Sequence, residues 1–361
     1  MPLITFPYLV RVLGVEKFGL VSFAMALTAY FNIIVDYGFN LTATKDVSIH
    51  RHDREYLSKI VSSVFIIKFA LLILSFGILM GLILFVEKFS SHPYLYLFSF
   101  GIVFGQMLFP QWFFQGIERM EYITFLNLVA KILFTIAIFL FVHTQDDFYK
   151  VPFIQSLGYM VAGVMALWII ATRHGLRAVF DWHKIRYYIV YNFSFFLSRL
   201  AVNLYTVSNT FILGLFFHAQ VVGQYSIAEK VVKIVQSLYG ILTQTLYPYI
   251  VKSKNVGLFK KVLFAATLLN ILFMAVLAYG AEYIFDLLFH IHDQEILKIF
   301  YVLCVVSLFI LPTYLLGFPI LGAFGYEKYA NLSAIYGAIL HLALLGGLIF
   351  FDLLSGYSVA L

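Results

Sequence analysis

Residues Arg11 to Asn40 read RVLGVEKFGLVSFAMALTAYFNIIVDYGFN, a short charged turn followed by a long apolar run that contains one acid, Asp36. From Phe18 to Asn40 the run is long enough to cross a bilayer as a helix, because about 20 residues span the ~30 Å hydrocarbon core. The preceding residues 1–13 are too few to cross it and are predicted to be the remnant of a first helix. This stretch therefore predicts a membrane protein with an acidic residue inside one of its first spans.

The composition of the whole chain agrees with a polytopic membrane protein. Of its 361 residues, 62% are hydrophobic and only 12% are charged, whereas about 25% are charged in soluble domains. An all-α fold of about twelve transmembrane helices is predicted, with the last helix, residues 356–361, cut short like the first. The spans after Asn40 are predicted at residues 60–86, 94–114, 122–142, 152–171, 187–217, 223–249, 262–288, 299–323 and 330–351.

A repeat relates the two halves of the chain at an offset of 204 residues, which is 222 minus 18. It places Phe18-Gly-Leu-Val-Ser-Phe-Ala24 beside Val222-Gly-Gln-Tyr-Ser-Ile-Ala228, and Asn127-Leu-Val-Ala130 beside Asn331-Leu-Ser-Ala334. Two separate matches at one offset indicate a duplicated unit. We therefore expect two pseudo-repeated six-helix lobes, at residues 1–180 and 185–361.

Basic residues are unevenly divided between the loops. The loops after the even-numbered helices carry fourteen of them: Lys45, Arg51, Arg54, Lys59, Arg119, Arg173, Arg177, Lys184, Arg186, Lys252, Lys254, Lys260, Lys261 and Lys328. The opposite loops carry four: Lys17, Lys88, Lys150 and Lys298. Because cytoplasmic loops are enriched in lysine and arginine, the amino terminus is predicted to be cytoplasmic.

This asymmetry can be tested with fused reporters. We expect a reporter that is active only in the cytoplasm to be active after Lys59 or Arg186 and inactive after Lys88 or Lys150. A reporter that is active only outside the cytoplasm is the control and should give the opposite pattern. Signals that are reversed at all four positions would show that the predicted topology is inverted.

Polar residues inside the predicted spans form stripes along single helix faces. At 100° per residue, Asn192, Arg199 and Asn203 share one face, and Glu229 and Lys233 share another. An ionisable group at bilayer depth costs about 2.5 to 3.5 kcal/mol, so such residues should face protein or water. We predict a water-filled cavity between the lobes, lined by the cations Lys68, Lys131, Arg199, Lys230 and Lys233 and the amides Asn32, Asn127, Asn192, Asn203 and Gln236.

Simpler roles for these residues stay open. Lys68 and the pair Lys230 and Lys233 could extend to the membrane interface, and Asp36 could pair with a neighbouring cation. The amides could instead hold helices together, at under about 1 kcal/mol each. Asp36 and Glu229 are the candidates for coupling transport to an ion gradient, and the sequence does not choose between proton and sodium.

Motifs of soluble enzymes and of metal sites are missing from the sequence. It contains no glycine-rich phosphate loop, nucleophile elbow or zinc-binding spacing, and the loop histidines His50, His52, His290 and His292 lack a supporting cluster. We expect a transporter, with no metal, cofactor or nucleic-acid partner. A membrane polysaccharide polymerase is the rival enzyme class, but it should have a sizeable periplasmic loop with catalytic charges.

Several stretches resemble a known family. Phe6-Pro-Tyr-Leu-Val-Arg-Val-Leu-Gly14, Asp36-Tyr-Gly-Phe-Asn-Leu-Thr-Ala-Thr-Lys45 and Gly223-Gln-Tyr-Ser-Ile-Ala-Glu-Lys230 are similar to Wzx-type O-antigen flippases. These belong to the multidrug/oligosaccharidyl-lipid/polysaccharide exporter superfamily, so the resemblance implies a MATE-like fold. It also implies a bacterial inner-membrane carrier that moves an undecaprenyl-pyrophosphate-linked sugar unit from cytoplasm to periplasm by alternating access, for lipopolysaccharide O-antigen biosynthesis. Other O-antigen assembly proteins would be its partners.

The balance of charges inside the spans favours this family over a second one in the same superfamily. The five predicted cavity cations outnumber the two acids, which suits a polyanionic pyrophosphate. A multidrug or cation antiporter, the alternative, should show the reverse balance because a cationic substrate requires carboxylates. The identity of the sugar cannot be read from the sequence.

Overall fold

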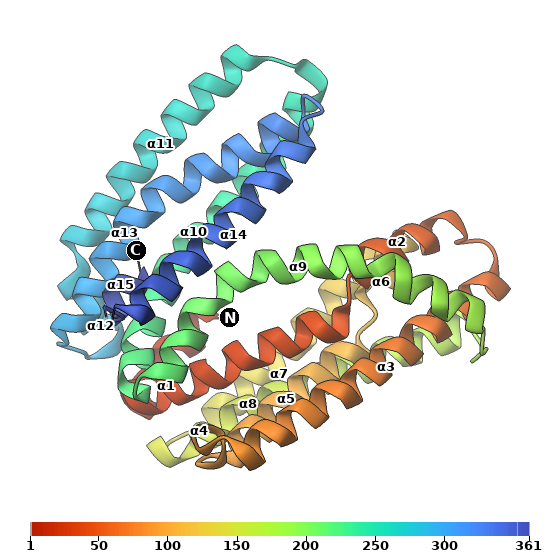
Figure 1. Cartoon of the computed structure of the whole chain (residues 1–361), viewed down its shortest axis with the longest axis horizontal. Helices are drawn as coiled ribbons and strands as arrows, with labels where there is room; N and C mark the ends of the chain where they lie inside the picture. Colours follow the sequence, from red (N-terminus) through yellow and green to blue (C-terminus); the bar gives the residue numbers. More distant parts are fainter. Residues whose placement is uncertain (1, 352, 361) are drawn as a thin grey trace. The chain divides into compact units, whose positions relative to one another are not determined.

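Helices make up all regular structure in the described part of the chain (Figure 1). The computed structural model describes residues 2–351 and 353–360, with the side chains of residues 2, 3, 198, 201, 202, 204–206, 318, 327, 331, 334 and 357 left out. The side chains of the repeat residues Asn331 and Ala334 therefore lie outside the described set. The all-α class predicted from the composition is confirmed.

The chain divides into two compact units. Residues 1–13 and 21–203 form the first unit, and residues 14–20 and 204–361 form the second, so that the boundaries fall inside helices. The helices that lie mostly or wholly in the first unit are α1 (Pro2–Asp36), α2 (Phe39–Ile49), α3 (Arg54–Phe85), α4 (Glu87–Ser90), α5 (Pro93–Leu108), α6 (Gln111–Gly116), α7 (Met120–Phe141), η1 (Gln145–Tyr149), α8 (Lys150–Ile169) and η2 (Ile170–His174).

The second unit contains fewer and mostly longer helices. Helix α9 (Trp182–Phe216) begins in the first unit and ends in the second. It is followed by α10 (Ala219–Ser253), α11 (Val256–Tyr279), α12 (Ala281–Phe289), α13 (Gln294–Leu315), the π-helical segment η3 (Leu316–Gly322), α14 (Glu327–Phe350) and α15 (Gly356–Ala360). Within this unit α10 and α11 both pack against α13.

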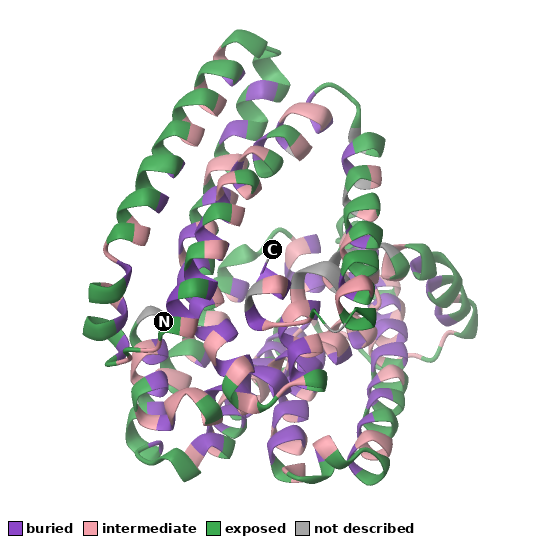
Figure 2. Ribbon diagram, turned by 60° about the vertical axis from the view of Figure 1, so that its left-hand side comes forward, coloured by how far each residue is buried: buried purple, intermediate pink, exposed green. Residues whose placement is uncertain are grey.

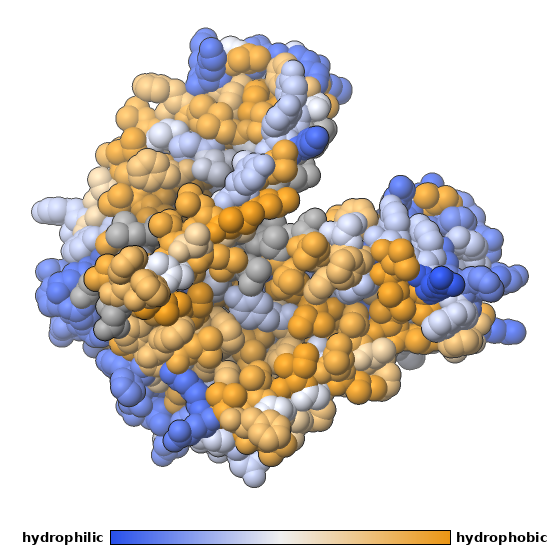
Figure 3. Space-filling view, in the orientation of Figure 1, coloured by the Kyte–Doolittle hydropathy of each residue, from blue (hydrophilic) through white to orange (hydrophobic). Residues whose placement is uncertain are grey.

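Apolar side chains cover the sides of the helices, and hydrophilic residues gather at helix ends (Figure 3). Long faces are exposed (Figure 2), and they include large residues such as Phe85, which is 87% exposed, and Phe264, which is 72% exposed. In water such a surface would cause aggregation, but lipid tails cover it in a membrane. The chain is therefore a multi-pass membrane protein.

Eight helices of the described chain are long and apolar enough to cross a membrane, against about twelve predicted. The difference has a physical cause. One apolar segment, Ile4–Ile49, joins the first two predicted spans. Helix α10 has 35 residues, which is more than the length required, but its polar stripe lowers its hydropathy. Helix α9 is equally long, and residues 198, 201, 202 and 204–206 within it are not fully described. The predicted twelfth helix is represented by the five residues of α15.

The first helical stretch of the chain is broken twice, each time at a glycine: Gly14 lies inside α1, and Gly38 lies between α1 and α2. Gly14 has φ 72° and ψ 170°, so that α1 is two helices joined end to end, close to the predicted boundary after residue 13. A second break separates α1 from α2, where Tyr37 and Gly38 both have positive φ, of 46° and 83°. Positive φ is unfavourable for residues with a Cβ, which explains a glycine at this turn. Asp36 is thus the last residue of α1 and stands beside a helix break that the apolar pattern did not predict.

A polar cluster in the first unit holds the beginning of α9 against α2 and α3. The ammonium group of Lys184 lies 3.0 Å from a carboxylate oxygen of Asp46 and donates to the hydroxyl of Tyr56 at 2.9 Å. The hydroxyl of Tyr188 donates to the same carboxylate at 2.8 Å. Tyr188 also packs in the buried apolar core with Phe39 and Trp112. These contacts fix the beginning of α9, the helix that contributes Arg199 and Asn203 to the site.

Two glycines of the repeat pack against each other's helices in the second unit. A Cβ added to Gly19 would collide with the backbone oxygen of Ala219, and one added to Gly223 would collide with that of Val15. The offset of 204 residues relates Val15 to Ala219 and Gly19 to Gly223. The contact of Gly19 with Ala219 therefore corresponds to the contact of Gly223 with Val15. Only residues without a side chain allow so close an approach of two helix backbones.

Candidate functional site

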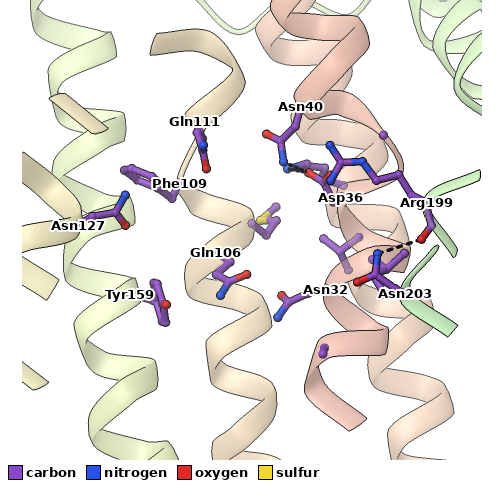
Figure 4. A pocket seen from close by; sticks show the side chains of 16 residues that line it. Asn32, Asp36, Asn40, Gln106, Phe109, Gln111, Asn127, Tyr159, Arg199 and Asn203 are labelled. Carbon is purple, nitrogen blue, oxygen red and sulfur yellow. Dashed lines mark hydrogen bonds and ion pairs between the residues drawn. The ribbon is translucent and has the colours of Figure 1, made fainter. Parts of the chain in front are cut away.

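A polar cavity of about 430 Å³ lies within the first unit. Its volume falls in the range of about 300 to 1,000 Å³ that is usual for ligand pockets, towards the lower end. Helices α1, α2, α3, α5, α6, α7, α8 and α9 contribute lining residues, and most of the polar ones point towards a common space (Figure 4). The polar residues are Asn32, Asp36, Asn40, Lys68, Gln106, Gln111, Asn127, Tyr159, Arg199 and Asn203.

An ion pair lies at the break between α1 and α2. The Nζ atom of Lys68 is 3.4 Å from Oδ1 of Asp36, and the side-chain amide of Asn40 donates to the same oxygen at 2.8 Å. The Lys68 side chain is only 5% exposed and that of Asp36 is 22% exposed. Lys68 therefore does not extend to the membrane interface, and Asp36 has a neighbouring cation. The pair is close to neutral, so it adds little net charge to the cavity.

The burial of this pair predicts how the protein responds when it is broken. We expect Lys68→Met to destabilise the protein, because it leaves the Asp36 carboxylate without its cation at bilayer depth. Breaking a fully buried ion pair lowers the free energy of unfolding by about 3 to 5 kcal/mol. The decrease should be smaller here, because Asp36 is partly solvated. Adding Asp36→Asn should restore most of the stability. Thermal unfolding of the purified full chain measures both effects, and a double variant less stable than Lys68→Met would contradict the pairing.

Arg199 supplies a second positive charge to the cavity. It lies on α9, and its backbone oxygen accepts a hydrogen bond from the amide of Asn203 at 2.9 Å (Figure 4). Among the described residues, no acid forms an ion pair with its guanidinium group. Of the three charged side chains that line the cavity, Asp36 and Lys68 compensate each other. The remaining net charge is therefore positive and belongs to Arg199.

Several uncharged polar residues of the cavity have no hydrogen-bonding partner. In the described part of the chain, nothing bonds to the side chains of Gln106, Gln111, Asn127 or Tyr159. Gln106, Gln111 and Tyr159 were not predicted. The available signal was the two glutamines on either side of Pro110 in an otherwise apolar span, but the sequence does not show which way they point.

The structure gathers part of the predicted set in this cavity. Asn32, Asn127 and Asn203 line it together with Asp36, Lys68 and Arg199. Lys131 is exposed on α7 outside the cavity lining, and Asn192 is fully buried on α9, also outside it. Both amide atoms of Asn192 lack a hydrogen-bonding partner among the described residues.

The remaining predicted residues lie on α10 in the second unit. Lys233 pairs with Glu229 at 2.9 Å, and the Lys230 ammonium lies 4.3 Å from the ring centre of Phe18. The side-chain amide of Gln236 donates to the hydroxyl of Ser307 on α13 at 2.8 Å. For Gln236 the structure thus shows the helix-packing contact that the sequence left open. Among the described residues, no three His, Cys, Asp or Glu side chains gather as metal ligands.

Comparison with known proteins gives matches of sequence and of fold. Residues 1–254 match the polysaccharide biosynthesis protein family. Two relatives carry the name "Putative O-antigen transporter". The one from Escherichia coli (strain K12) is 31% identical over 289 residues, which cover 78% of this chain and 70% of the relative. The one from Shigella dysenteriae is 26% identical over 252 residues, covering 70% and 63%.

A solved structure shares the fold. It is the inward-facing conformation of a multidrug resistance MATE family transporter of the MOP superfamily, with a TM-score of 0.73 and 12% sequence identity. The match covers 99% of this chain and 89% of the other. At this identity the likeness shows the fold alone, and it confirms the MATE-like, all-α polytopic architecture predicted above.

Proposed function

Since this chain belongs to the polysaccharide biosynthesis protein family and is a membrane transporter, we propose that it moves a lipid-linked oligosaccharide across the bacterial inner membrane. The substrate is a sugar repeat unit joined through pyrophosphate to undecaprenol. It crosses from cytoplasm to periplasm and serves the assembly of lipopolysaccharide O-antigen. The amino terminus lies in the cytoplasm, in accordance with the distribution of basic residues.

The charge of the cavity is the observation that carries this proposal. Pyrophosphate is a polyanion, and among its described lining residues the cavity has one uncompensated cation, Arg199, beside the ion pair of Asp36 and Lys68. A guanidinium group can donate two parallel hydrogen bonds to one phosphate and keeps its charge when it loses water. A cavity for a cationic drug would require an available carboxylate, and Asp36, the one acid among the described lining residues, is already paired. The cavity therefore supports the flippase over the multidrug antiporter.

Alternating access is the mechanism that suits this substrate and fold. The cavity accepts the charged head and its sugars while the polyprenyl chain stays in lipid, and rearrangement of the lobes carries the head across. Asp36 and Glu229 are the acids proposed for coupling to a proton or sodium gradient. Each is held by a lysine, Lys68 or Lys233, so a coupling ion would act by competing with that lysine.

Complementation tests the proposal. The full chain is expressed in bacterial strains that lack their own flippase and differ in the O-antigen sugar, and surface O-antigen is measured. We expect display to return in at least one strain and not with an empty vector. Resistance to cationic dyes should not change. Normal levels of membrane protein without display in any strain, together with dye resistance, would instead support the antiporter.

A further inference from the structure

The polar residues of the cavity fall on two sides that differ in charge. Asp36 and Arg199 lie on one side, on α1 and α9, whereas Gln106, Asn127 and Tyr159 lie on the other, on α5, α7 and α8 (Figure 4). Lys68, which pairs with Asp36, belongs to the charged side. No charged residue of α5, α7 or α8 is among the described residues that line the cavity. The second side is therefore polar but neutral.

The hydrogen bonding of this neutral side distinguishes it from the polar residues of the second unit. There the amide of Gln236 is bonded to Ser307, and the amide of Asn270 accepts from the hydroxyl of Tyr239 at 2.6 Å and donates to a backbone oxygen. Those amides connect helices. In contrast, Gln106, Asn127 and Tyr159 have no such partner in the described part of the chain. Polar groups at bilayer depth are costly unless bonded, so these are arranged for a ligand or water.

The chemistry of the neutral side matches carbohydrate hydroxyls. Each amide offers both donors and an acceptor, and a phenol offers one of each, while sugar hydroxyls also donate and accept. Neutral amides and phenols can also donate to a phosphate, but they lack the positive charge that strengthens such bonds, so a phosphate is better placed against Arg199. The apolar ring of Phe109 also lines the cavity and lies near this side (Figure 4).

We infer that the cavity has two subsites, and that Gln106, Asn127 and Tyr159 bind the sugar nearest the pyrophosphate. This inference rests on the proposed function and deepens it, because it separates the residues that select the sugar from the one that binds phosphate. The cavity of about 430 Å³ is assigned only the part of a long substrate that contains the pyrophosphate and the sugar next to it. The three residues are thus assigned to specificity and Arg199 to the head group that all such substrates share.

Binding of two kinds of synthetic probe tests the inference. One is farnesyl pyrophosphate, and the others are farnesyl-pyrophosphoryl sugars carrying glucose, galactose, N-acetylglucosamine or N-acetylgalactosamine. The purified full chain is titrated with each, and the sugar probe that binds most tightly is used with the variants. Gln106→Leu, Asn127→Leu and Tyr159→Phe remove hydrogen-bonding groups with little change of shape. Gln145→Leu, at an exposed residue of η1, is the matched control.

We expect each cavity variant to raise the Kd of the sugar probe roughly 3- to 10-fold, the usual effect of one lost hydrogen bond. The Kd of farnesyl pyrophosphate and the melting temperature should not change, and Gln145→Leu should affect neither probe. The inference is overturned if no sugar increases affinity over farnesyl pyrophosphate, or if the variants weaken both probes equally. The proposed function itself fails if the wild type binds neither kind of probe.

Discussion

Replacing Arg199 with alanine should reduce O-antigen display at least tenfold while the amount of protein in the membrane stays near normal. The expected loss follows from removing the only uncompensated cation among the described residues of the cavity. A charge-assisted hydrogen bond contributes about 1.5 to 3 kcal/mol, so the loss of a bidentate pair exceeds a factor of ten. Because Arg199 forms no ion pair with a described acid, its removal leaves no carboxylate unpaired.

Two further variants make this test specific. Arg199→Lys keeps the charge but not the two-pronged donor geometry, and it should retain partial activity. Arg186→Ala removes an exposed arginine from the same helix and should leave display unchanged. If Arg199 were instead a structural partner of an acid, Arg199→Ala would lower protein abundance. Normal display from Arg199→Ala would exclude the residue from transport.

The second large effect is expected at Gly223. Gly223→Ala places a methyl group against the backbone oxygen of Val15, which cannot move aside as a flexible side chain would. Forced separation of packed helices usually costs about 1 to 3 kcal/mol. We expect a lower melting temperature and less protein in the membrane, and the same from Gly19→Ala, whose methyl group would meet Ala219. The double variant should lose less than the sum, because both substitutions separate the same two helices.

Gly240 is the matched control for this prediction. It lies on the same helix as Gly223, but an added Cβ would have no atom within 4 Å. Gly240→Ala should therefore be neutral or stabilise the protein by up to about 1 kcal/mol, since alanine is the better helix former. The melting temperatures of the three single variants, measured by thermal unfolding and compared with that of the wild type, test this prediction. Equal stability of Gly223→Ala and the wild type would refute the role of the glycine contact.

The fold was largely predictable because membrane spans are encoded by length and hydropathy. The turn at Gly14 was also predicted, because a short charged stretch follows it. The break at Tyr37 and Gly38 was not, since polar and apolar residues continue with helical spacing on both sides of it. Helix α10 combines both signals: its length predicted a span, while its polar stripe predicted a functional face and lowered its hydropathy below that of the other spans.

The candidate site was predictable only in part. The polar stripe on one helix identified Arg199 and Asn203, because residues on one helix face share a direction. Gln106 and Gln236 show the limit: both are glutamines in membrane helices, yet one lines the cavity and the other bonds to a neighbouring helix. That distinction depends on the opposite helix, and a single sequence does not report which helices are neighbours.

The net charge of the cavity also affects how well the membrane resists leakage of ions and keeps its potential. A polar cavity at bilayer depth is a route along which protons and metal cations could leak and dissipate the potential across the membrane. With Asp36 paired to Lys68, the charge that an entering cation meets is that of Arg199, and in a medium of low dielectric constant this repulsion is strong. The same arginine that we propose attracts a polyanion should thus repel small cations, so that transport of a bulky substrate does not discharge the cell.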